Sequence, residues 1–463
     1  MFNDIEKYAD NIAIISDRDE VVYYRDLINF SNVIDSITEK RKLVFQLCTN
    51  TVSSVKFYIA FLRNKIVPVL VDRELNKELL DSLIKTYKPY YLCVPNDHKS
   101  NFNGVSEIYD DGNYSLLKTD FDNNFKLNED LGLMLTTSGS TGSPKFVKQS
   151  YKNIQSNAES IVQYLNIKST DRPITTLPMN YTYGLSIINS HIISGATLLL
   201  TDKTLMQKEF WAFFKQNNAT TFGGVPYTYE MLKKLRFFRM DLPSLKYLTQ
   251  AGGKLTYELT KEFVEFCSEK NIKFIVMYGQ TEATARMSYL PAEYALSKCG
   301  SMGIAIPGGK FSLIDENGNE ISEPDVVGEL VYEGPNVTLG YAEKGEDLIT
   351  GDERHGRLVT GDMAKRDSDG FYYITGRKKR FIKIFGSRVN LDECERLIKV
   401  ICSDCACSGV DDKMNIYITD ESLKDEVKKY IAEKTGINPV AFNVIVIDEI
   451  PKNESGKIIY AKL

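Results

Sequence analysis

Short apolar runs alternate, up to about residue 300, with segments in which apolar positions recur at helical spacing. The expected strands are residues 44–48, 67–71, 90–94, 196–201, 220–225 and 274–278, and the expected helices are 52–63, 77–88, 208–216 and 255–270. Strand–helix–strand repetition of this kind forms mostly parallel sheets that are covered by helices. The pattern therefore predicts a large N-terminal α/β domain.

Beyond about residue 300, turns that contain glycine become frequent and the apolar runs become shorter. Turns at 315–319 and 367–370 flank runs such as 329–332, which indicates an antiparallel or β-barrel-like subdomain. A basic stretch at 377–380 precedes a small α+β unit. The expected helices of this unit are 391–401 and 424–434, and its expected strands are 416–419 and 444–447. The predicted domains are residues 1–378 and residues 379–463.

Composition narrows the class of protein. The chain has 463 residues, of which 43% are hydrophobic, and its 57 basic and 62 acidic residues give a net charge of -5. This balance is ordinary for a folded protein and offers no basic surface for nucleic acid. The N-terminus is too polar for a signal peptide, and the longest apolar stretch, 185–200, is too short and too polar for a membrane span. We expect a cytoplasmic protein without a membrane span.

The cysteines could in principle hold a metal. Eight are present, and Cys402, Cys405 and Cys407 form a cluster. No second cluster has ligand spacing, so we expect these side chains to fill a buried strand.

A serine-, threonine- and glycine-rich segment carries the strongest chemical signal. It follows the apolar run 133–135, and its candidate ligand residues are Thr137, Ser138, Gly139, Ser140, Thr141, Gly142 and Lys145. Glycines that expose backbone N–H groups, hydroxyl donors and a lysine can together cradle a polyphosphate. The spacing is not that of a Walker A loop. The alternative is a solvated turn.

This segment resembles the phosphate loop of the adenylate-forming superfamily, which includes acyl-CoA synthetases, peptide-synthetase adenylation domains and luciferases. Further matching segments follow in the family's order, and the resemblance spans nearly the whole chain. They are Ala251-Gly252-Gly253, Tyr278-Gly279-Gln280-Thr281-Glu282, Thr360-Gly361-Asp362, Thr375-Gly376-Arg377 and Pro451-Lys452-Asn453-Glu454-Ser455-Gly456-Lys457.

The resemblance implies a site for ATP and Mg²⁺. Ala251, Gly252 and Gly253 correspond to the adenine-side turn, Tyr278 and Gly279 to the residues that contact adenine, and Asp362 and Arg377 to ribose and phosphate ligands. Thr281 and Glu282 are the implied catalytic pair, and Glu282 and Thr141 the implied Mg²⁺ ligands, because Mg²⁺ prefers oxygen donors. The residues alone also allow structural roles. Glu282 could be a favourable acidic residue at the N-terminus of a helix, and Asp362 could be a turn-forming residue.

The family's reaction also implies a mobile C-terminal domain. Lys457 matches the lysine that stabilises the negative charge developing during adenylation. Lys379 occupies the hinge position, and Lys383 resembles the lysine that serves a second domain orientation for thioester formation. The alternative for the last two is a basic, solvated stretch.

The acid pocket is where the match weakens. Tyr181, Thr182 and Tyr183 correspond to the family's gate, with Tyr181 in place of the common histidine, and Met287 is expected to line or abut the pocket. Amino-acid-activating members have an aspartate near the position of Thr182, and a buried ammonium without such a partner would be costly. An uncharged or acyl-type acid is therefore favoured over an α-amino acid.

These residues predict an AMP-forming acid–thiol ligase. It would activate a carboxylic acid as acyl-AMP with release of pyrophosphate, and then transfer the acyl group to CoA or to the phosphopantetheine thiol of a separate acyl-carrier protein. Two alternatives stay open: an amino-acid-activating ligase that loads a carrier or forms an amide, and a non-catalytic nucleotide-binding relative.

Overall fold

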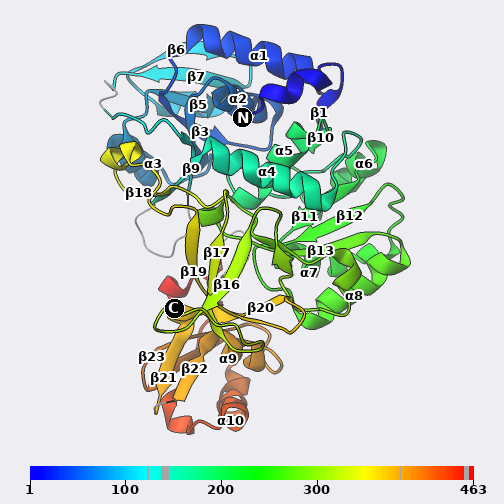
Figure 1. The fold of residues 1–463 in the computed structure, drawn as a ribbon, viewed down its shortest axis with the longest axis vertical. Helices are drawn as coiled ribbons and strands as arrows, with labels where there is room; N and C mark the ends of the chain where they lie inside the picture. Colours follow the sequence, from blue (N-terminus) through cyan, green and yellow to red (C-terminus); the bar gives the residue numbers. More distant parts are fainter. Residues whose placement is uncertain (122–124, 137–144, 386, 453–457) are drawn as a thin grey trace.

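The computed structural model describes residues 1–121, 125–136, 145–385, 387–452 and 458–463, and it has the predicted mixed α/β architecture (Figure 1). A large N-terminal part carries several sheets, and a smaller C-terminal part lies at one end of it. Several predicted site residues lie outside the described ranges: Thr137, Ser138, Gly139, Ser140, Thr141, Gly142 and Lys457.

The largest sheet has eight strands in the order β18-β9-β8-β4-β3-β5-β7-β6. Their bounds are β3 (Leu43–Cys48), β4 (Val67–Asp72), β5 (Tyr91–Pro95), β6 (Val105–Asp110), β7 (Tyr114–Thr119), β8 (Leu131–Thr136), β9 (Phe146–Ser150) and β18 (Gly340–Ala342). The central strands β8, β4, β3 and β5 are parallel. Helices α1 (Tyr24–Ile37), α2 (Val52–Arg63), α3 (Lys77–Tyr87) and α4 (Tyr151–Leu165) accompany this sheet. These parallel central strands confirm the alternation of strands and helices that was predicted for the first hundred residues.

A second sheet holds the strands that matter most for the site. Its order is β11 (Thr221–Gly224), β12 (Tyr247–Gln250), β13 (Lys273–Tyr278), β14 (Ser288–Tyr289) and β15 (Ile304–Ala305). The first three are parallel, so their carboxyl ends lie at the same edge. The accompanying helices are α5 (Thr182–Ile193), α6 (Lys208–Gln216), α7 (Pro226–Lys234) and α8 (Tyr257–Glu269). A three-stranded sheet, β10 (Leu198–Leu200), β1 (Ile12–Ser16) and β2 (Val21–Tyr23), completes this half.

The predicted turn-rich subdomain is an open antiparallel sheet. Its strands are β16 (Lys310–Ile314), β17 (Gly328–Glu333), β19 (Arg357–Arg366) and β20 (Tyr372–Arg377), in that order. The antiparallel arrangement is as predicted, but within the described residues β16 and β20 form the two edges and do not pair into a closed barrel. The prediction of a barrel-like subdomain was therefore wrong about the shape of the sheet. Frequent turns indicate that neighbouring strands pair antiparallel, but they do not determine whether the sheet closes into a barrel.

The C-terminal part has its own sheets and core. It contains β21 (Phe381–Ile384), β22 (Ser387–Asn390), β23 (Cys405–Val410), β24 (Lys413–Ile418) and β25 (Phe442–Val446), with α9 (Leu391–Ile398) and α10 (Lys424–Thr435). The cysteines at 402, 405 and 407 are buried in this core, as predicted. The ranges covered by the structure contain no group of His, Cys, Asp or Glu residues arranged to hold a metal. Of the helices described, none is long and apolar enough to cross a membrane.

Candidate active site

The carboxyl ends of β12 and β13 require glycine at two of the predicted positions. Gly252 has a φ of 83°, and a Cβ atom there would lie 2.7 Å from the hydroxyl of Tyr181. A Cβ atom on Gly279 would lie 1.6 Å from the carbonyl oxygen of Ala285, which no side chain could tolerate. Both turns therefore bring backbone groups close to their neighbours at the edge where α/β sheets bind ligands.

Three predicted nucleotide residues meet in one hydrogen-bonded network. The hydroxyl of Tyr278 donates to Asp362 Oδ2 at 2.6 Å, and Arg377 Nε lies 3.2 Å from Asp362 Oδ1. Gln280 Nε2 also donates to Asp362 Oδ2, at 2.9 Å. Burial, together with the neighbouring Asp362 carboxylate, raises the pKa of Tyr278 well above its ordinary value. The buried carboxylate is thus held in place by a phenol, an amide and a guanidinium.

The β19–β20 hairpin accounts for this convergence. Asp362 and Arg377 are direct partners in its antiparallel register. The side chain of Gln280, on the loop after β13, also donates to the carbonyl of Thr360 at 3.1 Å. Gln280 was not among the predicted site residues, although it stands inside the matched motif.

A second network surrounds Glu282. The hydroxyl of Tyr341 donates to Glu282 Oε1 at 2.7 Å, and the Lys145 ammonium lies 3.8 Å from the centre of the Tyr341 ring. Arg354 Nη1 donates to the carbonyl of Glu282 at 3.1 Å. Burial and the Glu282 carboxylate raise the pKa of Tyr341 to about 12. Tyr341, which the sequence reasoning missed, therefore links the predicted phosphate ligand Lys145 to the predicted Mg²⁺ ligand Glu282.

The donor set at Glu282 fits a magnesium ion. Only one of its carboxylate oxygens, Oε1, accepts a side-chain hydrogen bond from the described part of the chain. The other oxygen is left for a hard cation, which Mg²⁺ sites commonly complete with substrate phosphates and water. Thr281 lies beside Glu282 in the short 3-10 helix Thr281–Ala283.

The predicted gate residues lie at the start of α5. Tyr181 precedes the helix, with its hydroxyl against the Gly252 turn, and the hydroxyl of Tyr183 donates to Thr249 Oγ1 at 2.8 Å and to the carbonyl of Thr249 at 2.9 Å. The side chain of Met287 does not join them. It is fully buried in the core of the antiparallel subdomain, among residues such as Phe311.

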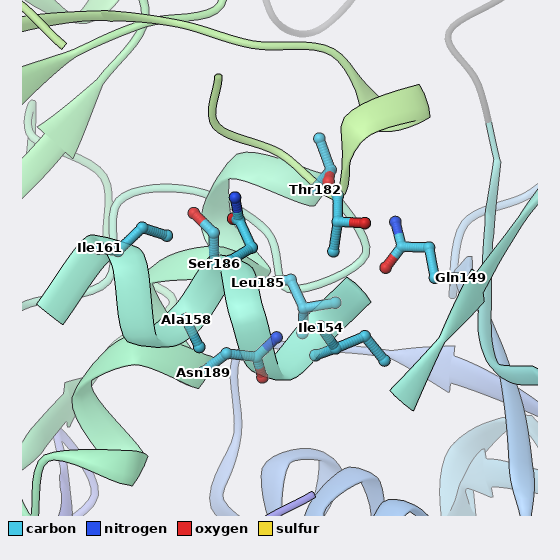
Figure 2. Close-up of a pocket in the computed structure, with 10 residues that line it drawn as sticks. Gln149, Ile154, Ala158, Ile161, Thr182, Leu185, Ser186 and Asn189 are labelled. Carbon is cyan, nitrogen blue, oxygen red and sulfur yellow. The ribbon is translucent and has the colours of Figure 1, made fainter. Parts of the chain in front are cut away.

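A small polar cavity lies between α4, α5 and β9 (Figure 2). Its volume of about 10 Å³ corresponds to one water molecule. Thr182 and Ser186 line it, as do Gln149 and Asn157. Among the described residues, Gln149 Nε2 and Asn157 Oδ1 are buried without a hydrogen-bond partner. The size and polar lining of the cavity suit a bound water and leave no room for a substrate.

Arg286, the residue before Met287, has its side chain directed to the gate helix. Its Nε donates to Ser186 Oγ at 3.1 Å, and its guanidinium carbon lies 5.1 Å from the centre of the Tyr183 ring. The sequence analysis did not predict a role for this residue, because it lies just beyond the matched motif.

Two of the predicted lysines, Lys379 and Lys383, lie in the described C-terminal part, away from these networks. Lys379 is exposed in the short helix Lys378–Arg380, between β20 and β21. Lys383 is exposed on β21, and its backbone N–H donates to Asp411 Oδ1 at 2.8 Å. Figure 1 shows β21 in the C-terminal part, apart from the ends of β12 and β13. The structure thus brings Tyr278, Asp362 and Arg377 together, but not Lys383.

Residues 3–342 match the family model described as AMP-binding enzyme. The chain belongs to this family. It is 29% identical to the 2-succinylbenzoate–CoA ligase of Bacillus licheniformis over 72% of this chain and 70% of the relative. The family assignment confirms the resemblance drawn from the motifs.

Solved structures of a related fold carry the ligands of an adenylating enzyme. The o-succinylbenzoate CoA synthetase of Bacillus subtilis, in complex with its acyl-adenylate intermediate, superposes with a TM-score of 0.80 at 21% identity, covering 98% of this chain and 96% of that one. The same enzyme with ATP and magnesium ion gives a TM-score of 0.78 at 22% identity, covering 98% of each chain. The predicted class, an AMP-forming ligase that uses ATP and Mg²⁺, is the class of these relatives.

Proposed function

We propose that this protein is an ATP-dependent acid–CoA ligase. One oxygen of a carboxylic acid attacks the α-phosphorus of ATP, the bond to pyrophosphate breaks, and acyl-AMP forms. A thiol sulfur then attacks the acyl carbon, AMP leaves, and the thiol proton passes to solvent. The observation that carries the proposal is the meeting of Tyr278, Asp362 and Arg377 at the strand ends, beside the Glu282–Tyr341–Lys145 group.

The described residues divide the work of the first step. Asp362 accepts hydrogen bonds from the ribose hydroxyls, and Tyr278 and Gln280 keep its carboxylate oriented. Lys145 neutralises charge on the phosphates from its place over the Tyr341 ring. Glu282 and Thr141 would hold Mg²⁺, which supplies Lewis-acid stabilisation of the phosphate charge.

The test is ATP–pyrophosphate exchange with a panel of acids. Aliphatic, aryl, hydroxy, dicarboxylic and amino acids are each supplied with ATP, Mg²⁺ and labelled pyrophosphate. We expect exchange with at least one acid that lacks an amino group, followed by thioester formation when CoA is added. Exchange with amino acids alone would favour the amino-acid-activating alternative. Nucleotide binding without exchange for any acid would favour the non-catalytic one.

CoA is the proposed acceptor because the named relative is a CoA ligase. A separate acyl-carrier protein is the alternative, and the same assay with carrier-bound phosphopantetheine in place of CoA distinguishes them. ATP and free thiols are abundant in the cytoplasm, where we place the reaction.

We also propose that residues 379–463 rotate about Lys379 between the two steps, so that Lys383 serves the second. Replacing Lys383 with Ala is expected to slow thioester formation about 100-fold and to change pyrophosphate exchange less than about threefold, because its charge is needed only after rotation. Single-turnover transfer of preformed acyl-AMP to CoA measures the second step.

Lys413→Ala provides the matched control, since Lys413 is another exposed lysine of the same part of the chain. It should leave both steps unchanged. Equal loss of both steps in the Lys383 variant would argue against domain rotation.

A further inference from the structure

Arg286 is a buried cation that has no acidic partner among the described residues. Its side chain is 2% exposed. Nε donates to Ser186 Oγ at 3.1 Å, and Nη1 donates to the hydroxyl of Tyr164 at 3.1 Å and to Met277 Sδ at 3.2 Å. All of these acceptors are neutral. Within the described ranges Nη2 donates no hydrogen bond, and no carboxylate forms an ion pair with the guanidinium.

The contrast with Lys148 shows that this arrangement is unusual for the molecule. Lys148 is fully buried as well, but its Nζ lies 3.4 Å from Glu353 Oε2. Arg380, in the C-terminal part, is held by both Asp392 and Glu395. An ionised group that is buried without a counter-charge is costly to stability.

Arg286 packs against residues that were predicted to form the gate for the acid. Tyr183, one of the predicted gate residues, lies over the guanidinium at 5.1 Å, and its hydroxyl is fixed by Thr249 at the end of β12. Arg286 follows Glu282 by four residues and lies on the loop that connects β13 to β14. The same loop therefore carries the residue predicted to hold phosphate-bound Mg²⁺ and a cation that faces the gate helix.

Arginine is suited to one kind of ligand above others. The guanidinium presents donors in a planar fork that matches the two oxygens of a carboxylate. Among the described residues, Nη2 has no hydrogen-bond acceptor, and the acceptors of Nε and Nη1 are two hydroxyls and a thioether. The hydroxyls of Ser186 and Tyr164 now donate to the carbonyl of Tyr183 at 2.7 Å and to Met277 Sδ at 3.2 Å. Rotation would exchange these acceptors for an anion that approaches the guanidinium. The environment thus offers several donors and one unpaired positive charge.

We propose that Arg286 binds a second carboxylate on the acid, so that the substrate is a dicarboxylic acid activated at its other carboxyl group. This inference rests on the proposed function and names the substrate class of the same site. The reacting carboxylate approaches ATP near Glu282 and Asp362, while the distal carboxylate pairs with Arg286. The ion pair with the distal carboxylate offsets the lost hydration of the guanidinium, and it forms only when a diacid is bound. The positive charge of Arg286 therefore selects for diacids.

The experiment uses matched pairs of acids that differ by one charge. Each linear or aromatic dicarboxylic acid in the exchange assay is paired with its mono-amide, which has nearly the same size but is neutral at the distal end. For the preferred diacid, wild-type kcat/KM is expected to exceed that for the mono-amide by about 100-fold or more, since a site built for polar contacts rejects analogues that lack them. In Arg286→Met this ratio should fall below about threefold. Arg286→Lys, which keeps the charge but loses the fork, should give an intermediate ratio.

The outcomes separate the inference from the function on which it rests. Wild-type exchange with neutral acids or mono-amides at rates equal to those with diacids would overturn the role of Arg286 and leave the ligase intact. An unchanged ratio in Arg286→Met would overturn it too. Absence of exchange with every acid would remove both proposals.

Folding is checked by thermal denaturation, with Arg172→Met as control. Arg172 is another partly buried arginine of the N-terminal part, and its Nη1 donates to the carbonyl of Asn217, away from the gate. That variant should keep the wild-type ratio. If Arg286→Met does not fold, the ratio in Arg286→Lys decides: a ratio equal to that of the wild type would overturn the role of the guanidinium fork, and a clear fall would support it.

Discussion

Replacing Lys457 with Ala is expected to slow acyl-adenylate formation about 1000-fold while ATP affinity changes less than tenfold. In the role that the motif resemblance implies for Lys457, the ammonium would stabilise the negative charge that develops on the α-phosphate during attack and would contribute little in the ground state. Pyrophosphate exchange at saturating ATP measures the chemical step, and equilibrium binding of ATP measures the affinity. Lys452→Ala serves as control, because Lys452 lies in the same C-terminal segment and pairs with Asp404 at 2.6 Å.

Unchanged exchange in the Lys457 variant would remove this residue from the mechanism. If ATP affinity fell as much as the exchange rate, Lys457 would instead be a residue that binds ATP in the ground state. Thioester formation from preformed acyl-AMP should persist in the variant, because that step does not need the same charge.

Replacing Glu282 with Gln is expected to slow exchange by about 100-fold or more and to raise the Mg²⁺ concentration needed for half-maximal rate. The amide keeps the size of the side chain and can still accept from Tyr341, so the fold should be preserved. What it loses is the negative charge that a hard cation requires. A titration of exchange rate against Mg²⁺ concentration separates this effect from a simple loss of activity.

Tyr341→Phe provides the comparison for Glu282. It removes only the hydroxyl that donates to Glu282 Oε1, so its effect should stay within about tenfold, the size of one hydrogen bond. An unchanged Mg²⁺ dependence in Glu282→Gln would show that the carboxylate has a structural role.

The buried parallel strands could be predicted well because both of their faces are covered. Residues 67–71 form an apolar run, and the strand observed is Val67–Asp72. Helix ends were less accurate: the predicted 255–270 helix begins at Tyr257, because the Thr256 side chain accepts from the backbone N–H of Leu259 and caps it. Helix α4 was not predicted, although Ile154, Ala158, Ile161 and Leu165 recur at helical spacing and are buried.

The candidate site was predictable only where a motif marks it. Asp362 and Tyr278 were named from matched segments, and the structure joins them by a hydrogen bond. Tyr341 and Arg286 lie outside those segments, and no local pattern indicates which remote side chains they meet. Met287 was named only because it follows the matched motif closely, and sequence distance from a motif does not show whether a side chain faces a pocket or, as here, a hydrophobic core.

The pairing of Arg377 with Asp362 links nucleotide occupancy to the connection between the two parts of the molecule. Arg377 ends β20, and the exposed lysine proposed as the pivot follows two residues later. If Asp362 binds the ribose as we propose, the ribose hydroxyls compete with the Arg377 guanidinium for the same carboxylate oxygens. Binding or release of the nucleotide would then change a contact two residues before the proposed pivot, with no need for coupling through more distant parts of the protein.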